Sequence, residues 1–387
     1  MTIITVNSEV DWRHFYQVPV QIYAGDPNYI SPLESDVRAV FDPEKNRAFT
    51  HGNAACFVLL DDNRPIGRIA AFIDHERNAS NDYPVGGIGF FECTDDEVAA
   101  GLLFAQAEAW LAQWEVKAID GPINFGERDK FCGLLVRGDF PPLYQENYHP
   151  AYYQRLFVAQ GYQPYEQILT FHGVMSEVPI GRFTQIAERV RTRYDLRTES
   201  MDKGRNIPRF ADDFATVYNK AFSKNPYFKP LKGSQLRRIF KTMQPVADLR
   251  MVFITYAADV PVAFAAFMPD LNPFLLKQAG RLRWYQIPGF LLRIRRAKKH
   301  LLKGIAFGID PEYQRKGAFA ALIAAIYNDH TRTRYSDFYL ATIRGHNSVM
   351  VKSISNLGVA VERVHLAYRK MIDEQLPLAP FPFLEIE

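Results

Sequence analysis

Apolar and polar positions follow the same order in the two halves of the chain. In the first half they predict a helix (10–21), a hairpin (56–60 and 66–73), a strand (85–93), a helix (98–114), a strand (118–120), a helix (151–159) and a strand (167–171). In the second half they predict a helix (210–222), a hairpin (251–255 and 262–268), a strand (305–309), a helix (318–328), a strand (338–343), a helix (348–356) and a strand (364–370). This repetition indicates a tandem duplication of one α/β unit.

The length of the chain agrees with two units. At 387 residues it exceeds one average domain, and 48% hydrophobic residues are enough for two packed cores. A basic, amphipathic stretch at 182–194 predicts a helix that connects the halves. We therefore expect an N-terminal domain at 1–175 and a C-terminal domain at 176–387.

The stretch 308–322 combines structural and chemical signals. An apolar strand stops at Asp310, a polar and basic turn ends at Gly317, and an Ala-rich helix follows. The free backbone N–H groups and the positive dipole end of this helix would face the turn. Because Arg315 and Lys316 lie in the same turn, the stretch predicts an anion site that suits phosphate.

This stretch resembles the acyl-CoA signature of the GNAT acyltransferase superfamily, V-x-P-x-x-[Q/R]-x-x-G-x-[G/A], at Ile309, Pro311, Gln314 and Gly317. The resemblance implies two tandem GNAT-like acyl-CoA N-acyltransferase domains of the α/β (α+β) class, each with a mixed, mostly antiparallel sheet flanked by helices. It also implies acetyl-CoA or another acyl-CoA as co-substrate, bound by Phe307, Gly308, Ile309, Gln314, Arg315, Lys316, Gly317, Ala318, Phe319 and Asn347.

Two positions depart from the family pattern. Phe319 stands where the signature has Gly or Ala, and Ile354 stands where many members carry a Tyr that acts as general acid. In the first half, the segment 92–97 takes the place of the basic turn and contains four acids, which would repel a pyrophosphate. We therefore expect the N-terminal domain to lack the CoA loop.

Positive charge is concentrated ahead of the signature. The chain has a formal net charge of +3, but 271–309 has no Asp or Glu and nine Lys and Arg, which leaves −6 for the rest. The basic insertion 271–304 mixes these charges with aromatic and aliphatic residues, and 289–302 has the pattern of an amphipathic helix. Such a segment could cover nucleotide phosphates, contact nucleic acid or dock on an anionic membrane surface through 281–303; the alternative is a solvated basic face over a packed apolar one.

The acceptor of the acyl group would be held by the segment 121–153 of the first half. Its first residues, Gly121 to Gly126 (Gly-Pro-x-Asn-Phe-Gly), and the basic stretch from Lys277 to Lys303 also resemble a group of bacterial tandem-GNAT proteins. The segment is rich in aromatic, amide and charged side chains that can stack on a small molecule and form hydrogen bonds with it. The predicted substrate-binding residues are Asn124, Arg128, Tyr144, Asn147, Tyr148 and Tyr152. The alternative is a long structured loop that packs the halves together.

Amide formation requires an amine to attack the thioester and a base to accept its proton. The catalytic candidates are Glu127, Asp129 and His149, and Glu146, Asp310 and His346 stay open as further bases. The three cysteines are widely spaced and lack metal-ligand spacing, so we expect neither a metal site nor disulfides.

The resemblance thus implies an acyl-CoA-dependent N-acyltransferase that transfers an acetyl or longer acyl group to a small-molecule or amphiphilic amine. Two alternatives stay open: a Fem-like transferase that uses aminoacyl-tRNA, and a non-catalytic GNAT-like module that binds ligands or a membrane surface. A nucleic-acid partner fits the composition less well. Without an apolar run of membrane-spanning length or a basic leader, we expect a cytoplasmic protein.

Overall fold

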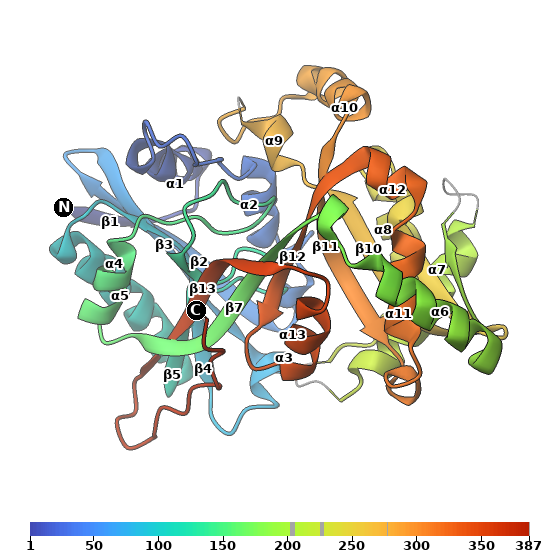
Figure 1. Ribbon diagram of the computed structural model, residues 1–387. Coiled ribbons are helices and arrows are strands. Elements are labelled where there is room, and N and C mark those ends of the chain that lie inside the picture. Colours follow the sequence, from blue (N-terminus) through green and yellow to red (C-terminus); the bar gives the residue numbers. More distant parts are fainter. Residues whose placement is uncertain (202–205, 225–227, 277, 387) are drawn as a thin grey trace.

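The computed structural model describes residues 1–201, 206–224, 228–276 and 278–386. Within these residues, thirteen strands form one continuous mixed sheet, and helices cover both of its faces (Figure 1). The strands lie in the order β1-β2-β3-β4-β5-β13-β7-β12-β11-β10-β9-β8, and β6 pairs with β13. Only β4 with β5 and β11 with β12 run parallel among the described pairs, so the expected α/β class and mostly antiparallel sheet are confirmed.

The first half follows the predicted order of elements. Its elements are β1 (Thr2–Thr5), α1 (Glu9–Ile22), α2 (Glu34–Val40), β2 (Gly52–Asp61), β3 (Arg64–Asp74), α3 (His75–Asn78), β4 (Val85–Cys93), α4 (Glu97–Leu111), β5 (Ala118–Gly121), β6 (Leu134–Arg137), α5 (Tyr153–Ala159) and β7 (Gln163–Val174). The side chain of Ser8 accepts a hydrogen bond from the backbone N–H of Asp11 and starts α1.

The second half repeats that order with additional short helices. Its elements are α6 (Ile180–Tyr194), β8 (Leu196–Ser200), α7 (Ile207–Phe222), α8 (Gly233–Met243), β9 (Val252–Ala257), β10 (Val260–Pro269), α9 (Asn272–Leu275), α10 (Ile287–Arg296), β11 (His300–Ile309), α11 (Ala318–Ile326), α12 (Asp329–Arg334), β12 (Tyr335–Arg344), α13 (Ser348–Ser355) and β13 (Ala360–Met371). Lys277 of the basic insertion lies outside the described residues.

The closing strands of the two halves are exchanged. β7 ends the first half but pairs with β12 and β13 of the second half. β13 ends the second half but pairs with β5, β6 and β7 of the first half. The two halves therefore share one sheet across their junction, and the domain boundary at 175 stays a prediction.

Four apolar clusters fix the helices to the sheet. In the first half, α4 and α5 pack on one face around Leu103 and Phe157, and α1 packs on the other around Phe15. In the second half, α6 and α11 share a cluster that contains Val190, and α7 and α8 share one that contains Phe214. Among the described residues, no helix has both the length and the apolar character that crossing a membrane requires.

Two sequence predictions need correction. The amphipathic helix expected at 289–302 ends at Arg296, and β11 begins at His300 because Leu301 and Leu302 pair with β12. The segment 121–153, expected to be irregular up to 151, contains β6, which pairs with β13.

Candidate active site

The central feature of the second half is a fork between the parallel strands β11 and β12. Their pairing runs from His300 opposite Tyr335 to Gly304 opposite Leu340 and stops there. Beyond the fork, β11 pairs only with β10, while β12 continues beside β7. On the side away from β10, alternate backbone N–H and C=O groups of 305–309 therefore form a free edge that no described strand covers.

Both strands are irregular at the level of the fork. Ile305 is an extra residue in β11, because Gly304 and Ala306 pair with consecutive residues of β10. In β12, Ala341 and Thr342 lie opposite one residue of β7, and Thr342 has a φ of 60°. Bulges and left-handed non-Gly residues often mark functional sites, because they redirect side chains at a local cost.

The predicted turn and helix follow the free edge of β11. After the short 3-10 helix η6 (Pro311–Tyr313), Gly317 occupies the N-cap position of α11 with a φ of 82°. No side chain caps this helix, so its first amides can meet an anion. Gln314 and Arg315 are exposed, and Lys316 Nζ lies 4.4 Å from the ring centroid of Tyr313.

The two residues at the start of α11 face the connecting helix α6. A Cβ atom on Gly317 would lie 2.6 Å from Val190 Cγ1, so the missing side chain allows α6 to pack here. The half-buried ring of Phe319 packs against Phe183 of α6 and Phe307 of β11, with centroid distances of 6.0 Å and 5.5 Å. Gly317 is thus needed for packing, and the Phe319 ring has protein neighbours on two sides.

The corresponding helix of the first half is closed to anions. The Asp96 carboxylate accepts hydrogen bonds from Val98 N and Ala99 N, so an internal negative charge occupies the start of α4. Arg155 forms ion pairs with Asp95 and Glu97. Glu92 was expected in this acidic loop, but it lies in β4, where it is buried and forms an ion pair with Arg68 of β3. The fourth acid therefore does not contribute to repulsion at the loop.

A pocket opens at the fork. It contains about 290 Å³ of space between atoms, part of it open to solvent. Side chains from both halves line it: Asp129, Lys130, Phe131, Cys132, Gln145, Glu146, Ile168, Thr170, Lys303, Ala341, Thr342 and His365. The Thr342 hydroxyl donates a hydrogen bond to the Asp129 carbonyl oxygen (3.1 Å), which joins the segment 121–153 to the fork.

Asp129 is the predicted catalytic residue that lines this pocket. Asp129 is exposed as a residue, although protein atoms surround its carboxylate group. This enclosure and the nearby Glu127 carboxylate raise the pKa of Asp129. Among the described residues, none forms an ion pair with the Asp129 carboxylate, so it is available to accept a proton.

The other charged groups of the pocket have protein partners. Burial alone would raise the pKa of Glu146, but Arg363 Nη1 at 3.0 Å and the Thr170 hydroxyl at 2.6 Å lower it. Burial lowers the pKa of Lys303, whose ammonium group donates to the carbonyl oxygen of Tyr144.

His365 lines the pocket as a neutral imidazole. Burial lowers the pKa of His365, and its Nε2 lies 2.9 Å from the Asn147 carbonyl oxygen. That nitrogen therefore carries the proton and donates it.

The other two catalytic candidates lie elsewhere. Glu127 is 72% exposed and forms an ion pair with Lys130 at 2.6 Å. His149 is partly buried, and its Nδ1 accepts a hydrogen bond from Leu135 N at 3.1 Å. Burial lowers the pKa of His149 to about 3, so it stays neutral. Neither residue lines a described pocket.

The predicted substrate-binding residues divide into two groups. Asn124 and Arg128 line a second pocket of about 310 Å³ in the first half, and Asn124 Oδ1 has no hydrogen-bond partner. The others bond to protein: Tyr144 to Asp36, Asn147 to Gly133, Tyr148 to Asp26 and Tyr152 to Cys93. These four side chains hold the segment 121–153 in place, and none of them lines either pocket.

The downstream landmarks have structural contacts. The Asn347 side chain caps α13 by accepting a hydrogen bond from Met350 N. Ile354, at the position where many GNAT proteins carry Tyr, is buried in an apolar cluster with Val351. The structure therefore offers no hydroxyl at the usual position of the general acid.

Sequence reasoning missed several residues of the pocket at the fork. The sequence pattern placed Lys303 only in the basic insertion, favoured a structural role for the isolated His365, and gave Thr170 and Thr342 no role in the site. Lys303 is a single charged residue in an apolar stretch, and this pattern could have indicated a buried functional side chain. The other three reach the pocket through strand pairings between the halves, which no local pattern indicates.

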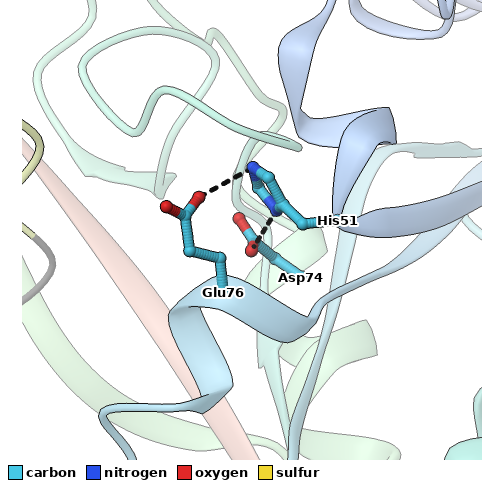
Figure 2. Close-up of side chains that lie close together, drawn as sticks. All are labelled: His51, Asp74 and Glu76. Carbon is cyan, nitrogen blue, oxygen red and sulfur yellow. Dashed lines mark ion pairs between the residues drawn. The ribbon is translucent and has the colours of Figure 1, made fainter.

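A separate cluster of potential metal ligands lies in the first half. Figure 2 shows His51 between Asp74 and Glu76, with nitrogen–oxygen distances of 2.8 Å and 2.9 Å. Their ligand atoms lie within 4.8 Å of one another. Lys229 of the second half also forms an ion pair with Glu76. Through this ion pair of Lys229 and Glu76, the cluster links the two halves.

Comparisons with known proteins find two relatives of nearly full length. The chain is 23% identical over 382 residues to the bacterial ceramide synthase of Caulobacter vibrioides, covering 96% of this chain and 98% of the relative. It is 23% identical over 371 residues to protein YghO of Escherichia coli, covering 94% and 93%. No family model matches the chain.

Solved structures resemble the whole chain. A GCN5-related N-acetyltransferase from Sphaerobacter thermophilus covers 100% of this chain and 98% of its own, with a TM-score of 0.51 at 11% identity. A tandem GNAT protein of the clavulanic acid biosynthesis pathway covers 96% of this chain and 98% of its own, with a TM-score of 0.54 at 10% identity. The chain therefore has the tandem fold of the GCN5-related N-acetyltransferase (GNAT) superfamily.

Proposed function

We propose that this protein is an acyl-CoA-dependent N-acyltransferase whose active site is the fork between β11 and β12. The observation that carries the proposal is the coincidence of three features: an uncovered strand edge, an uncapped helix start at one end of it, and a pocket at the other. The fold supports acyl transfer in general, and these features support a site in the second half.

The residues present fit an acyl-CoA. The amides at the start of α11, with Arg315 and Lys316, would hold the pyrophosphate. The free edge of 305–309 would bond to the amides of the pantetheine arm, as a strand pairs with a neighbour. Five residue steps from Ile309 back to Gly304 span about 16 Å in a strand. The thioester end would thus reach the pocket.

Asp129 would act as the base in this pocket. An acyl-CoA supplies an activated carbonyl carbon, to which the amine nitrogen bonds while the carbon–sulfur bond breaks. The Asp129 carboxylate would accept the proton that the amine loses. The buried ammonium of Lys303 would stabilise the negative charge that develops in the pocket.

We propose an amphiphilic, long-chain amine as acceptor and a fatty acyl group as donor. The Caulobacter relative is named a ceramide synthase, and a ceramide is the amide of a long-chain amino alcohol and a fatty acid. Partly buried aromatic side chains near the free edge support this choice, because Tyr218 and Phe222 of α7 form an aromatic cluster with Phe228 and the fully buried Phe264. Phe264 in turn lies directly behind Gly308.

A matrix of substrates tests the proposal. Acetyl-CoA, octanoyl-CoA and palmitoyl-CoA are each combined with a long-chain amino alcohol and with a short polar amine. Free thiol and the amide product are then measured. We expect both products, in equal amounts, for the long-chain amine with a fatty acyl donor. No thiol release in any combination, or transfer only from aminoacyl-tRNA, would contradict it.

A further inference from the structure

The basic insertion forms a projecting surface. We call it the α10 patch and define it by Trp284, Tyr285, Ile287 and Leu292 together with Arg283, Arg293, Arg295, Arg296 and Lys298. In Figure 1, α10 lies at the outer edge of the molecule, away from the sheet. Trp284 is 82% exposed, and Ile287 and Leu292 are 41% and 46% exposed. Large apolar side chains grouped in this way on a surface usually mark an interaction site.

The patch is held rigidly from below. Phe290 and Ile294, one helical turn apart, are buried in a cluster with Leu275 of α9 and Met268 of β10. Arg334 of α12 donates hydrogen bonds to the carbonyl oxygens of Ile294, Arg295 and Ala297 at the end of α10. The exposed apolar residues are therefore additional to those that fix the helix.

Positive charge surrounds the apolar side chains. Arg293, Arg295, Arg296 and Lys298 are exposed, and within the described part of the chain none of them has an acidic partner. No Asp or Glu occurs in 271–309. Arg281 is the exception in the insertion, because it forms an ion pair with Glu34. The patch thus presents a concentrated positive field.

We propose that the α10 patch docks on membranes that contain anionic phospholipids. Trp and Tyr favour the level of the lipid headgroups, Ile and Leu can insert just below it, and Arg and Lys attract lipid phosphates. An RNA partner would use the cations but would leave Ile287 and Leu292 without a contact. The exposed aliphatic side chains therefore favour the bilayer.

The patch is connected to the pocket at the fork. β11 begins at His300, directly after Lys299, and Lys303 lines the pocket. Lys303 donates to the carbonyl oxygen of Tyr144, and the Tyr144 side chain packs against the cluster below α10. The three residue steps from His300 to Lys303 span about 10 Å of strand. A docked protein would thus hold the pocket close to its membrane contact. The docking proposal rests on the patch alone. If the acceptor is amphiphilic, as proposed above, docking would bring the pocket close to the membrane that contains it.

Vesicle sedimentation with the full chain tests the proposal. The probes are vesicles of phosphatidylcholine alone and of phosphatidylcholine mixed with phosphatidylglycerol. We expect binding to the mixed vesicles only, with a blue shift of Trp284 fluorescence that is absent in W284A. Absence of binding to the mixed vesicles, or binding to tRNA that competes with it, would overturn the proposal.

Two charge-reversal variants separate specific docking from general attraction. R293E/R295E changes the patch, while R189E/R191E makes the same charge change on the exposed side of the basic helix α6. We expect the first to weaken vesicle binding by at least about tenfold. The second should weaken it by less than about threefold, and equal losses would overturn the proposal.

CoA binding in solution distinguishes this proposal from the proposed function. R293E/R295E should retain the CoA affinity and the activity of the native protein toward amine dissolved in detergent. Loss of vesicle binding with retained CoA binding supports docking by the patch. If the native protein does not bind CoA, the proposed function is contradicted but the docking result is unaffected.

Discussion

Asp129 and Glu127 are carboxylates two positions apart with different surroundings. Asp129 lines the pocket at the fork without an ion pair among the described residues, whereas Glu127 is exposed and bound to Lys130. A base must be near the amine and free of an ion pair, so we assign this role to Asp129. The sequence could nominate both residues, but it could not show which of them faces a pocket.

Replacement of the base gives the first prediction. We expect D129N to lower kcat by about 10²- to 10⁴-fold, because an amide cannot accept the proton. The CoA dissociation constant should not change. The control E127Q should retain kcat within about twofold, since surface substitutions have small effects. Steady-state kinetics and calorimetry measure both quantities, and a D129N enzyme as active as E127Q would contradict the assignment.

The pH dependence gives the second prediction. Enclosure and Glu127 raise the pKa of Asp129, so the base becomes protonated at a higher pH than an ordinary Asp. Activity should therefore be retained above this raised pKa and should fall as the pH decreases through it. A profile of kcat/KM against pH measures it. The acidic limb should disappear in D129N, and its persistence there would assign it to another group.

The buried pair of Glu146 and Arg363 stabilises the wall of the same pocket. We expect R363M to lower the free energy of unfolding by about 3–5 kcal/mol, because it leaves a buried carboxylate without its partner. The double variant E146Q/R363M should recover part of that loss. Denaturant unfolding measures both. An R363M protein that is less destabilised than the double variant would contradict the pairing.

Arg363 also gives this pair a pH signature. Burial acts to raise the pKa of Glu146, but Arg363 and its hydrogen bonds lower it overall. The stabilisation is therefore complete above the ordinary Glu pKa of about 4.3 and is lost as the pH falls through the lower folded value. Stability measured between neutral and acidic pH should show this loss in the native protein but not in E146Q/R363M.

At the scale of elements, local patterns predicted the second part of β11, the turn and α11 well. Their order follows from an apolar run, a Pro and a Gly, which act within a few residues. The end of α10 and the start of β11 were wrong, because Leu301 and Leu302 fit a helical period and a strand equally. Pairing with β12, which is distant in sequence, selects the strand.

Gly317 connects the turn to the helix α6. We expect G317A to lower the free energy of unfolding by about 1–3 kcal/mol, because its φ of 82° disfavours a side chain and the Cβ would meet Val190. V190A should offset part of this loss in the double variant. Thermal unfolding measures the series. A neutral G317A would show that α6 does not pack here.

Phe319 replaces the small residue of the acyl-CoA signature. Its ring contacts Phe183 and Phe307, so we expect F319A to lower stability by about 2 kcal/mol. The CoA dissociation constant should stay within about threefold. Calorimetry distinguishes a packing role for the Phe319 ring from blockage of the CoA site. If the ring blocked the site, CoA would bind more tightly to F319A.

At the scale of the whole molecule, the repeated order of elements was predictable but the exchange of closing strands was not. Periodicity identifies β7 and β13 as strands, yet it does not specify a partner among the described strands of similar apolar character. The exchange brings Thr170 and His365 to the pocket at the fork. This explains why the sequence located the cofactor turn more completely than the acceptor pocket.

The exchange gives a prediction about fragments. Residues 1–175 lack β13, which lies between β5 and β7, and residues 176–387 lack β7, which lies between β12 and β13. We expect neither fragment to show a cooperative unfolding transition alone, and we expect co-expression to restore one. Circular dichroism during heating measures this. Cooperative unfolding of a lone fragment would contradict the shared sheet as a folding unit.

Hydrogen exchange with and without CoA tests whether the acyl-CoA site lies at the fork between β11 and β12. We expect saturating CoA to slow amide exchange in peptides that cover 304–309 and 315–320. Peptides that cover the start of α4 should be unaffected, because Asp96 occupies that helix start. Unchanged exchange at the fork with CoA present, or protection at α4 instead, would contradict the assignment of the acyl-CoA site to the fork between β11 and β12.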